Sequence, residues 1–132
     1  MPFAENRCPI ELTLPADPNL MLVTRLTAAG VIAKAGITVD RMDELKMAVE
    51  EACGCLIDQA NAPARIAVRF VCEDGSLLIR AEALDAAEPV GSVTADELDV
   101  MRCILCALVD EAALEVRDGW IAAVSMKAAL SR

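Results

Sequence analysis

The sequence predicts an α+β fold, a two-layer sandwich in which about three helices cover one face of a mostly antiparallel sheet of about five strands. Two Asp-Gly turns each lie between strand-like segments, which is typical of antiparallel hairpins. Three other segments carry apolar residues at helical spacing, so the order is strand, helix, helix, hairpin, helix, hairpin. The 132 residues have the length of one domain, and we expect a single domain over residues 1–132.

The first strand and the first helix are predicted from local signals. Residues 10–14, IELTL, alternate apolar and polar side chains before a proline, which is typical of a short strand at a sheet edge. An Asp-Pro pair at 17–18 then predicts the start of a helix over residues 19–35, which a glycine ends. The apolar stripe of this helix has four residues at helical spacing and four that widen it: Leu22, Leu26, Ala29 and Ala33, then Leu20, Val23, Val31 and Ile32. An alanine-rich helix of this kind can bury one side on the sheet and the other on a partner.

The second helix is predicted to start at Thr38 or Asp40 and to run to about Ala60, because an asparagine and a proline follow. Its apolar residues alternate at spacings of three and four, which is typical of one buried helical face. This face consists of Met42, Leu45, Val49, Ala52 and Leu56.

The remaining elements are two hairpins and a third helix. Residues 66–72 and 76–83 are predicted strands around a Glu-Asp-Gly turn, and residues 114–126 read as strand, Asp-Gly turn and strand. Between the hairpins, Thr94 and Glu97 have the spacing of a capping box, which predicts the start of the third helix. Its apolar residues are Leu98, Met101, Leu105, Leu108 and Val109.

The composition excludes several functional classes. The chain has 12 basic and 21 acidic residues, a formal net charge of −9 and no histidine. This acidity disfavours nucleic acid as a partner, and an aromatic content of 2% leaves few rings for stacking on bases. Histidine is the commonest metal ligand and the usual general base near neutral pH, so we expect no metal site.

The hydropathy pattern argues against a membrane protein. The longest uninterrupted apolar run, residues 103–109, is far shorter than the roughly 20 residues that a membrane-spanning helix needs. The first ten residues also lack the basic and apolar regions of a signal peptide. We therefore expect a cytoplasmic protein that does not contact a membrane.

Six cysteines lie at positions 8, 53, 55, 72, 103 and 106, mostly in apolar segments, which favours reduced, buried thiols over a disulfide framework. Cys103 and Cys106 have the CxxC spacing of redox and zinc sites, so a thiol or zinc protein is one alternative function. Both lie within the apolar run of a predicted helix, not at a helix start after a strand. This position favours core packing for the pair.

The segment DRMDELKMAVEEACGCLIDQA, residues 40–60, resembles the helix that carries the N-box in the anti-sigma-factor serine/threonine kinases. These kinases are members of the GHKL superfamily of histidine-kinase-like ATPases. Residues 11–37 resemble the family's opening strand and first helix, and residues 101–130 resemble its last helix and closing hairpin. The resemblance covers roughly residues 10–130 and implies the GHKL, or Bergerat, fold.

The resemblance assigns two residues of this helix to the family's N-box. In the family, a glutamate acts as a base or orients water, and an asparagine four residues later gives an oxygen to the magnesium ion on ATP. The glutamate falls on Glu51, and the asparagine position falls on Cys55, whose soft sulfur suits magnesium poorly. Glu51 is either this catalytic residue or one more solvated carboxylate of an acidic helix.

Two further nucleotide-binding elements of the family map onto the middle of the chain. The aspartate that binds adenine in the DxGxG box falls on Ala83, and the first glycine falls on Asp85. A gap of one or two residues would instead make Asp85 the adenine acceptor. The glycine-rich segment that cradles phosphates retains Gly91, which acidic residues that repel a triphosphate follow: Asp96, Glu97 and Asp99.

The resemblance implies an anti-sigma-factor-like regulator of transcription that acts by protein–protein binding. Its implied partners are a sigma factor, an anti-anti-sigma protein and a second copy of the chain. Because all three nucleotide-binding elements are altered, we expect an eroded ATP site and no cofactor. The alternative is an active serine kinase that uses ATP, magnesium and Glu51.

Overall fold

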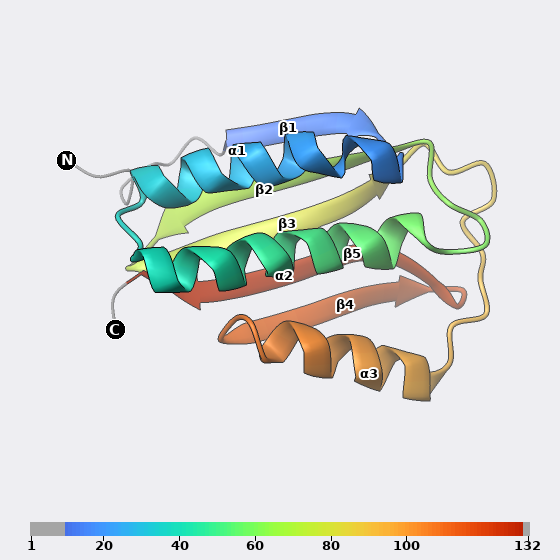
Figure 1. Ribbon diagram of the computed structural model, residues 1–132. Helices are drawn as coiled ribbons and strands as arrows, with labels where there is room; N and C mark the ends of the chain where they lie inside the picture. The colour runs from blue at the N-terminus through green and yellow to red at the C-terminus, as the bar shows by residue number, and fades with distance from the viewer. Residues whose placement is uncertain (1–9, 131–132) are drawn as a thin grey trace.

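The computed structural model describes residues 10–130 and has the predicted order of elements (Figure 1). Five strands form one antiparallel sheet in the order β1-β2-β3-β5-β4, and three helices lie side by side on one face of it. The predicted α+β sandwich is therefore confirmed. The elements are β1 (Ile10–Pro15), a 3-10 turn (Pro18–Leu20), α1 (Met21–Lys34), α2 (Val39–Ile57), β2 (Arg65–Glu73), β3 (Ser76–Leu84), α3 (Ala95–Cys106), β4 (Glu111–Arg117) and β5 (Trp120–Ala129).

Both predicted hairpins form, and β1 is an edge strand as predicted. The turn between β2 and β3 has Asp74 and Gly75 at φ 50° and 74°, and the turn between β4 and β5 has Asp118 and Gly119 at φ 53° and 70°. Two successive residues with positive φ are the signature of the tight turn that matches the twist of a hairpin. An Asp-Gly pair adopts this conformation readily, which is why the sequence signal was reliable.

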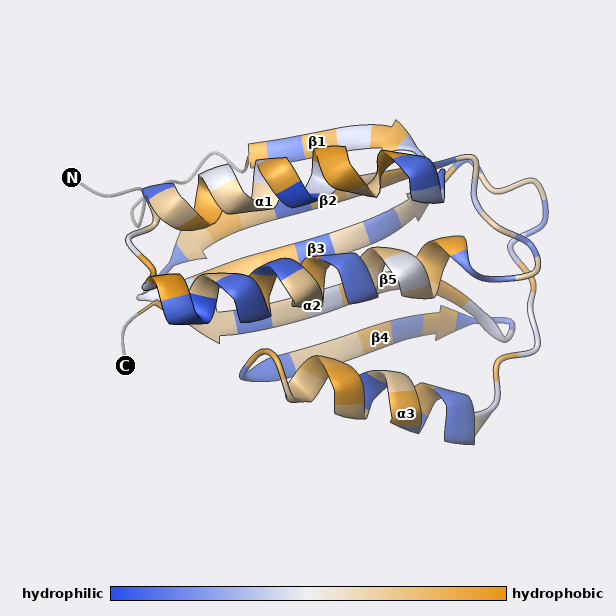
Figure 2. Ribbon diagram, viewed as in Figure 1, coloured by the Kyte–Doolittle hydropathy of each residue, from blue (hydrophilic) through white to orange (hydrophobic). Residues whose placement is uncertain are grey.

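The core lies between the sheet and the helices and is almost entirely aliphatic, as the low aromatic content predicts. Buried residues of the strands contribute to it, and α2 lies over the middle of the sheet, against β3 and β5 (Figure 1). Figure 2 shows that α2 presents mainly hydrophilic residues on its outer side. The largest fully buried side chains include Phe70, Ile32, Leu45, Leu56, Ile66, Leu77, Ile79, Leu105 and Ile121.

The buried face of α1 differs from its predicted stripe. Val31 and Ile32 of the predicted stripe are buried, but Leu22 and Leu26 are 58% and 63% exposed. Thr24 and Ala28, which the predicted stripe did not include, are buried. The helix is apolar nearly all round, so periodicity does not identify the side that faces the sheet. The small residues at 24 and 28 face inward, and the larger leucines remain in solvent.

The ends of the other two helices are close to the prediction. Thr94 and Glu97 form the predicted capping box, in which Glu97 N donates to Thr94 Oγ1 (3.1 Å) and Thr94 N donates to Glu97 Oε1 (2.9 Å). The second helix begins after Thr38 as predicted but ends at Ile57, three residues before Ala60. The third ends at Cys106, so Leu108 and Val109 lie in the following turn.

The prediction that Cys103 and Cys106 pack in the core is wrong, because both are exposed on α3. This helix fully buries only Leu105, and the two cysteines lie away from that line of contact. Cys53 and Cys72 are buried and Cys55 is partly buried, as predicted, and all five described cysteines are free thiols. Cys8 lies outside the described residues. Within residues 10–130, none of the helices has both the length and the apolar character to cross a bilayer.

Candidate functional site

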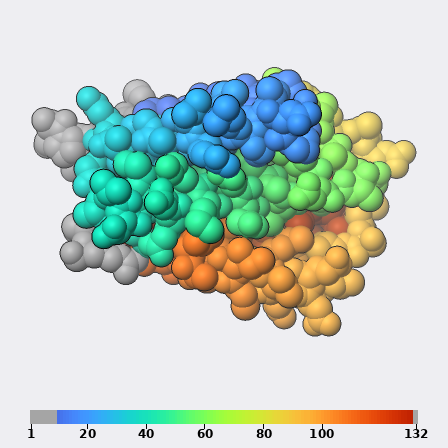
Figure 3. Space-filling model, viewed as in Figure 1, coloured from blue at the N-terminus to red at the C-terminus, as the bar shows by residue number. Residues whose placement is uncertain are grey.

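A hollow of about 320 Å³ opens between the end of α2, the start of α3 and the hairpin turn that joins β4 to β5. Figure 3 shows it as a depression beside α2 and α3 with β5 at its floor. Its volume is near the lower limit for small-molecule pockets. Since α2 and the segment before α3 both contribute to its lining, it is where the resemblance places the nucleotide.

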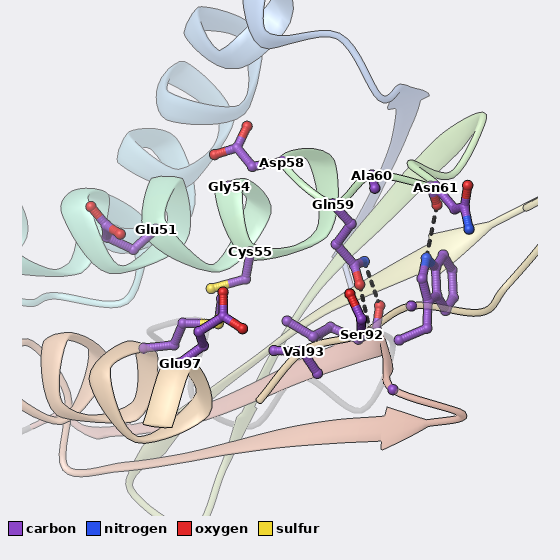
Figure 4. Close-up of a pocket in the computed structure, with 15 residues that line it drawn as sticks. Glu51, Gly54, Cys55, Asp58, Gln59, Ala60, Asn61, Ser92, Val93 and Glu97 are labelled. Carbon is purple, nitrogen blue, oxygen red and sulfur yellow. Dashed lines mark hydrogen bonds between the residues drawn. The ribbon is translucent and has the colours of Figure 1, made fainter. Parts of the chain in front are cut away.

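Three of the five residues that the sequence assigned to a site line this hollow: Glu51, Cys55 and Gly91. Glu51 and Cys55 are four residues apart on α2, so they share one helical face. Figure 4 shows Cys55 pointing from α2 into the hollow, toward the side on which Glu97 lies. Glu97, at the start of α3, is the lining residue from the acidic segment that the sequence singled out.

The other two residues, Ala83 and Asp85, are not part of the lining. Ala83 lies near the end of β3, opposite Ile66 of β2. Asp85 is exposed just beyond that strand at φ 57°, and its Oδ2 accepts a hydrogen bond from Arg65 Nε at 2.6 Å. The carboxylate that could have replaced the adenine acceptor is therefore paired outside the hollow.

The hollow is strongly acidic. Glu51, Asp58 and Glu97 contribute carboxylates, and none of its described lining residues is lysine or arginine. Burial is the main cause that raises the pKa of the Cys55 thiol to about 11, and the negative charges of Glu51 and Asp58 contribute to this shift. Cys55 is thus a neutral thiol near pH 7, at the position that the resemblance assigns to a magnesium ligand.

One polar residue that the sequence analysis missed connects α2 to the sheet at the floor of the hollow. Gln59 Nε2 donates to the Ile121 carbonyl oxygen at 2.9 Å, and Gln59 Oε1 accepts from Ile121 N at 2.7 Å (Figure 4). Gln59 Nε2 also donates to the Leu56 carbonyl oxygen at 3.2 Å. These partners are up to 62 residues apart in sequence. No local pattern distinguishes such a glutamine from an ordinary polar residue at a helix end.

Asn61 and Trp120 fix the loop beside this glutamine. Trp120 Nε1 donates to the Asn61 carbonyl oxygen at 2.8 Å (Figure 4). Asn61 Nδ2 donates to the Val90 carbonyl oxygen at 2.6 Å. Trp120 is only 4% exposed. The loop after α2 is therefore bound both to β5 and to the segment that precedes α3.

The segment that precedes α3 also bonds directly to the hairpin turn. Gly91 N donates to the Asp118 carbonyl oxygen and Val93 N donates to the Gly119 carbonyl oxygen, both at 3.0 Å. These two backbone segments approach so closely that a Cβ on Gly91 would lie 2.6 Å from the Gly119 carbonyl oxygen. The retained glycine thus allows this close approach, and two amides that could have bound phosphate already have carbonyl partners.

These residues do not fit a magnesium–nucleotide complex. A triphosphate would meet three carboxylates and no cation among the described lining residues, and two nearby backbone amides are already bonded. Among residues 10–130, no group of three or more Cys, Asp and Glu side chains is placed to hold a metal ion. The hydrogen bonds between the segment before α3 and the hairpin turn suit a structural contact better than a phosphate-binding lid.

The fold is shared with a solved structure. A crystal structure of the RsbU and RsbW domains of a Mycobacterium tuberculosis protein matches 95% of this chain and 33% of that chain, with a TM-score of 0.70 at 18% sequence identity. No protein-family model matches the chain. The class is thus an α+β domain with the fold found in that RsbU–RsbW structure.

The sequence comparison is more specific. The chain is 37% identical to the serine-protein kinase RsbW of Bacillus velezensis over 81 residues, which are 58% of this chain and 51% of that protein. It is 36% identical to RsbW of Bacillus subtilis with the same coverage, and 41% identical to RsbW of Halalkalibacterium halodurans over 51 residues, 39% of this chain and 32% of that protein. The chain spans about half the length of the first two relatives. The predicted resemblance to the anti-sigma-factor serine kinases is confirmed.

Proposed function

We propose that this protein is an anti-sigma-factor-like regulator that works by binding other proteins, and that its hollow no longer binds ATP. The similarity to RsbW kinases supports the regulatory class. The lining of the hollow supports the loss of nucleotide binding. Such a regulator of transcription would act in the cytoplasm.

The charge of the hollow is the observation that supports the loss of ATP binding. Three carboxylates line it without a lysine or arginine among the described lining residues. At an effective dielectric constant of about 20, a carboxylate about 6 Å from a phosphate charge opposes binding by about 3 kcal/mol. Magnesium would normally offset such repulsion, but the thiol of Cys55 is a poor magnesium ligand.

The partners in this proposal are a sigma factor, an anti-anti-sigma protein and a second copy of the chain. The exposed side of α1 is a suitable surface for the second copy, because Leu22, Val23 and Leu26 are 58%, 44% and 63% exposed. Figure 2 shows hydrophobic residues on the outer side of this helix. Contiguous exposed apolar side chains commonly mark protein–protein interfaces.

An active serine kinase is the second candidate function. Two observations favour it: the relatives are named serine-protein kinases, and Glu51 still lines the hollow at the family's position. In this case Glu51 would orient the attacking hydroxyl and another acid would replace the missing magnesium ligand.

A fluorescent ADP analogue separates the two candidates. The purified protein, shown to be folded by circular dichroism, is titrated into the analogue with magnesium while anisotropy is recorded. RsbW of Bacillus subtilis serves as the positive control. We expect no saturable signal from this protein, and saturable binding in the micromolar range that excess ATP reverses would overturn the proposal in favour of the kinase.

A further inference from the structure

Two exposed thiols lie together on α3, outside the hollow. Cys103 and Cys106 are both exposed, and residues three apart on a helix are neighbours on its surface, with Cβ atoms about 5–6 Å apart. Val100 and Ile104 on the same helix are 58% and 43% exposed, so this side of α3 is open to solvent. Free cysteine is usually among the most buried residue types, which makes an exposed pair unusual.

The other described thiols have a different environment. Cys53 and Cys72 are 0% and 2% exposed, and burial raises the pKa of Cys53 to about 12 and that of Cys72 to about 11. Cys55 likewise has its pKa raised to about 11, with burial as the main cause. Because the thiolate is the reactive form, these three thiols are poorly reactive near neutral pH. Among the described cysteines, Cys103 and Cys106 are the two that are exposed to solvent.

A disulfide between Cys103 and Cys106 requires the last turn of α3 to tighten. A disulfide needs Cβ atoms about 3.5–4.5 Å apart, so the pair must close by about 1–2 Å. Cys106 is the last residue of α3, where Ala107 N bonds to the carbonyl oxygens of Cys103 and Leu105. Mixed bonding of this kind is typical of a final turn, which frays and tightens more easily than a helix interior.

We propose that Cys103 and Cys106 form a redox-active dithiol whose oxidant is a low-molecular-weight disulfide such as oxidised glutathione. The thiolate of one cysteine attacks a sulfur of the small disulfide, forms a mixed disulfide and releases one small thiolate. The thiolate of the second cysteine then attacks the protein sulfur of the mixed disulfide and releases the second small thiolate. The two cysteine protons pass to the released thiolates, so the cysteines are oxidised to one S–S bond and the small disulfide is reduced to two thiols.

The geometry favours the internal bond over other products. The second thiol is held next to the first by the helix, so its attack on the mixed disulfide is intramolecular and faster than attack by a thiol from solution. A structural zinc site is a less favoured function for Cys103 and Cys106. Zinc takes four ligands, and no group of three candidate ligands occurs within residues 10–130.

The test uses a tryptic peptide that isolates the pair. Cleavage after Arg102 and Arg117 gives residues 103–117, which contain both cysteines and no other. A Cys8→Ser protein is incubated folded with oxidised glutathione, its free thiols are blocked with iodoacetamide, and the digest is weighed by mass spectrometry. We expect this peptide to lose two hydrogen atoms in mass and to escape alkylation, while the peptides with Cys53, Cys55 and Cys72 are unmodified by glutathione.

Two variants make the result specific. In Cys103→Ser and Cys106→Ser proteins, the remaining cysteine should stop at the mixed disulfide and carry one glutathione. A parent peptide that stays reduced, carries glutathione on both cysteines, or appears only in intermolecular cross-links would overturn the proposal. Circular dichroism before and after oxidation establishes that the reacting protein is folded.

Discussion

Replacement of Gln59 by alanine tests the hydrogen bonds by which this side chain connects the end of α2 to β5. The side chain makes two hydrogen bonds to the backbone of Ile121 and one to Leu56, in a partly buried position. A typical intramolecular hydrogen bond contributes about 0.5–1.5 kcal/mol, and the Ile121 groups would lose their partners. We therefore expect Gln59→Ala to lower the free energy of unfolding by about 2–3 kcal/mol.

The assay is urea unfolding followed by the fluorescence of Trp120, the single tryptophan, which lies next to these hydrogen bonds. Glu73→Ala, at an exposed position at the end of β2, is the control and should change stability by less than about 0.5 kcal/mol. Gln59→Glu keeps an acceptor for Ile121 N but loses the amide donor, so it should have an intermediate effect. A loss of less than about 0.5 kcal/mol in Gln59→Ala would refute the structural role of this side chain.

Three further changes are predicted. Gly91→Ala should destabilise the protein by about 1–3 kcal/mol in the same assay, because the new Cβ would lie 2.6 Å from a backbone oxygen of the hairpin turn; unchanged stability would contradict this close approach. The Arg80 side chain hydrogen-bonds to Glu115 and lowers the pKa of that carboxyl, so the stabilisation is present above the ordinary carboxyl range and is lost as pH falls through the folded-state pKa. Glu115→Gln should thus be less stable than the parent at pH 7 in urea titrations but not at pH 2, and an equal difference at both pH values would refute the linkage. Leu26→Glu should convert a dimer to a monomer in sedimentation velocity, whereas Val39→Glu, at a position 75% exposed on α2, should not; a monomeric parent would contradict the proposed dimer.

The elements could be predicted from sequence because their signals are local. The Asp-Gly turns and the capping box of Thr94 and Glu97 each depend on a few consecutive residues, and all three form as predicted. The order of these elements then leaves few arrangements for a sheet with helices on one face.

The side on which a residue lies was harder to predict. Leu26 of α1 and Cys103 of α3 were predicted to be buried, yet both are exposed. A helix that is apolar on several sides does not identify its buried face, and that choice depends on the neighbouring elements. The predicted face of α2 is correct, because Leu45, Val49, Ala52 and Leu56 are all buried. The buried side was mispredicted for part of α1 and for the two cysteines of α3.

The structure brings some of the residues assigned by the resemblance together and separates others. Glu51, Cys55 and Gly91 meet at one hollow because the resemblance assigns them to elements that the fold brings together. Asp85 lies outside the hollow, just after β3, where its carboxylate pairs with Arg65 of the neighbouring strand β2. The bonds from Gln59 and Asn61 also join distant segments, and a single sequence carries no pattern for them.

Isothermal titration calorimetry with ADP and magnesium tests most directly whether the hollow has lost the ability to bind a nucleotide. The folded protein is titrated near pH 7, with RsbW of Bacillus subtilis as the positive control. With three carboxylates in the lining and Cys55 at the position that the resemblance assigns to the magnesium ligand, we predict no saturable heat, which corresponds to a Kd weaker than about 1 mM. A saturable isotherm with a micromolar Kd that requires magnesium would contradict the proposed loss of the ATP site.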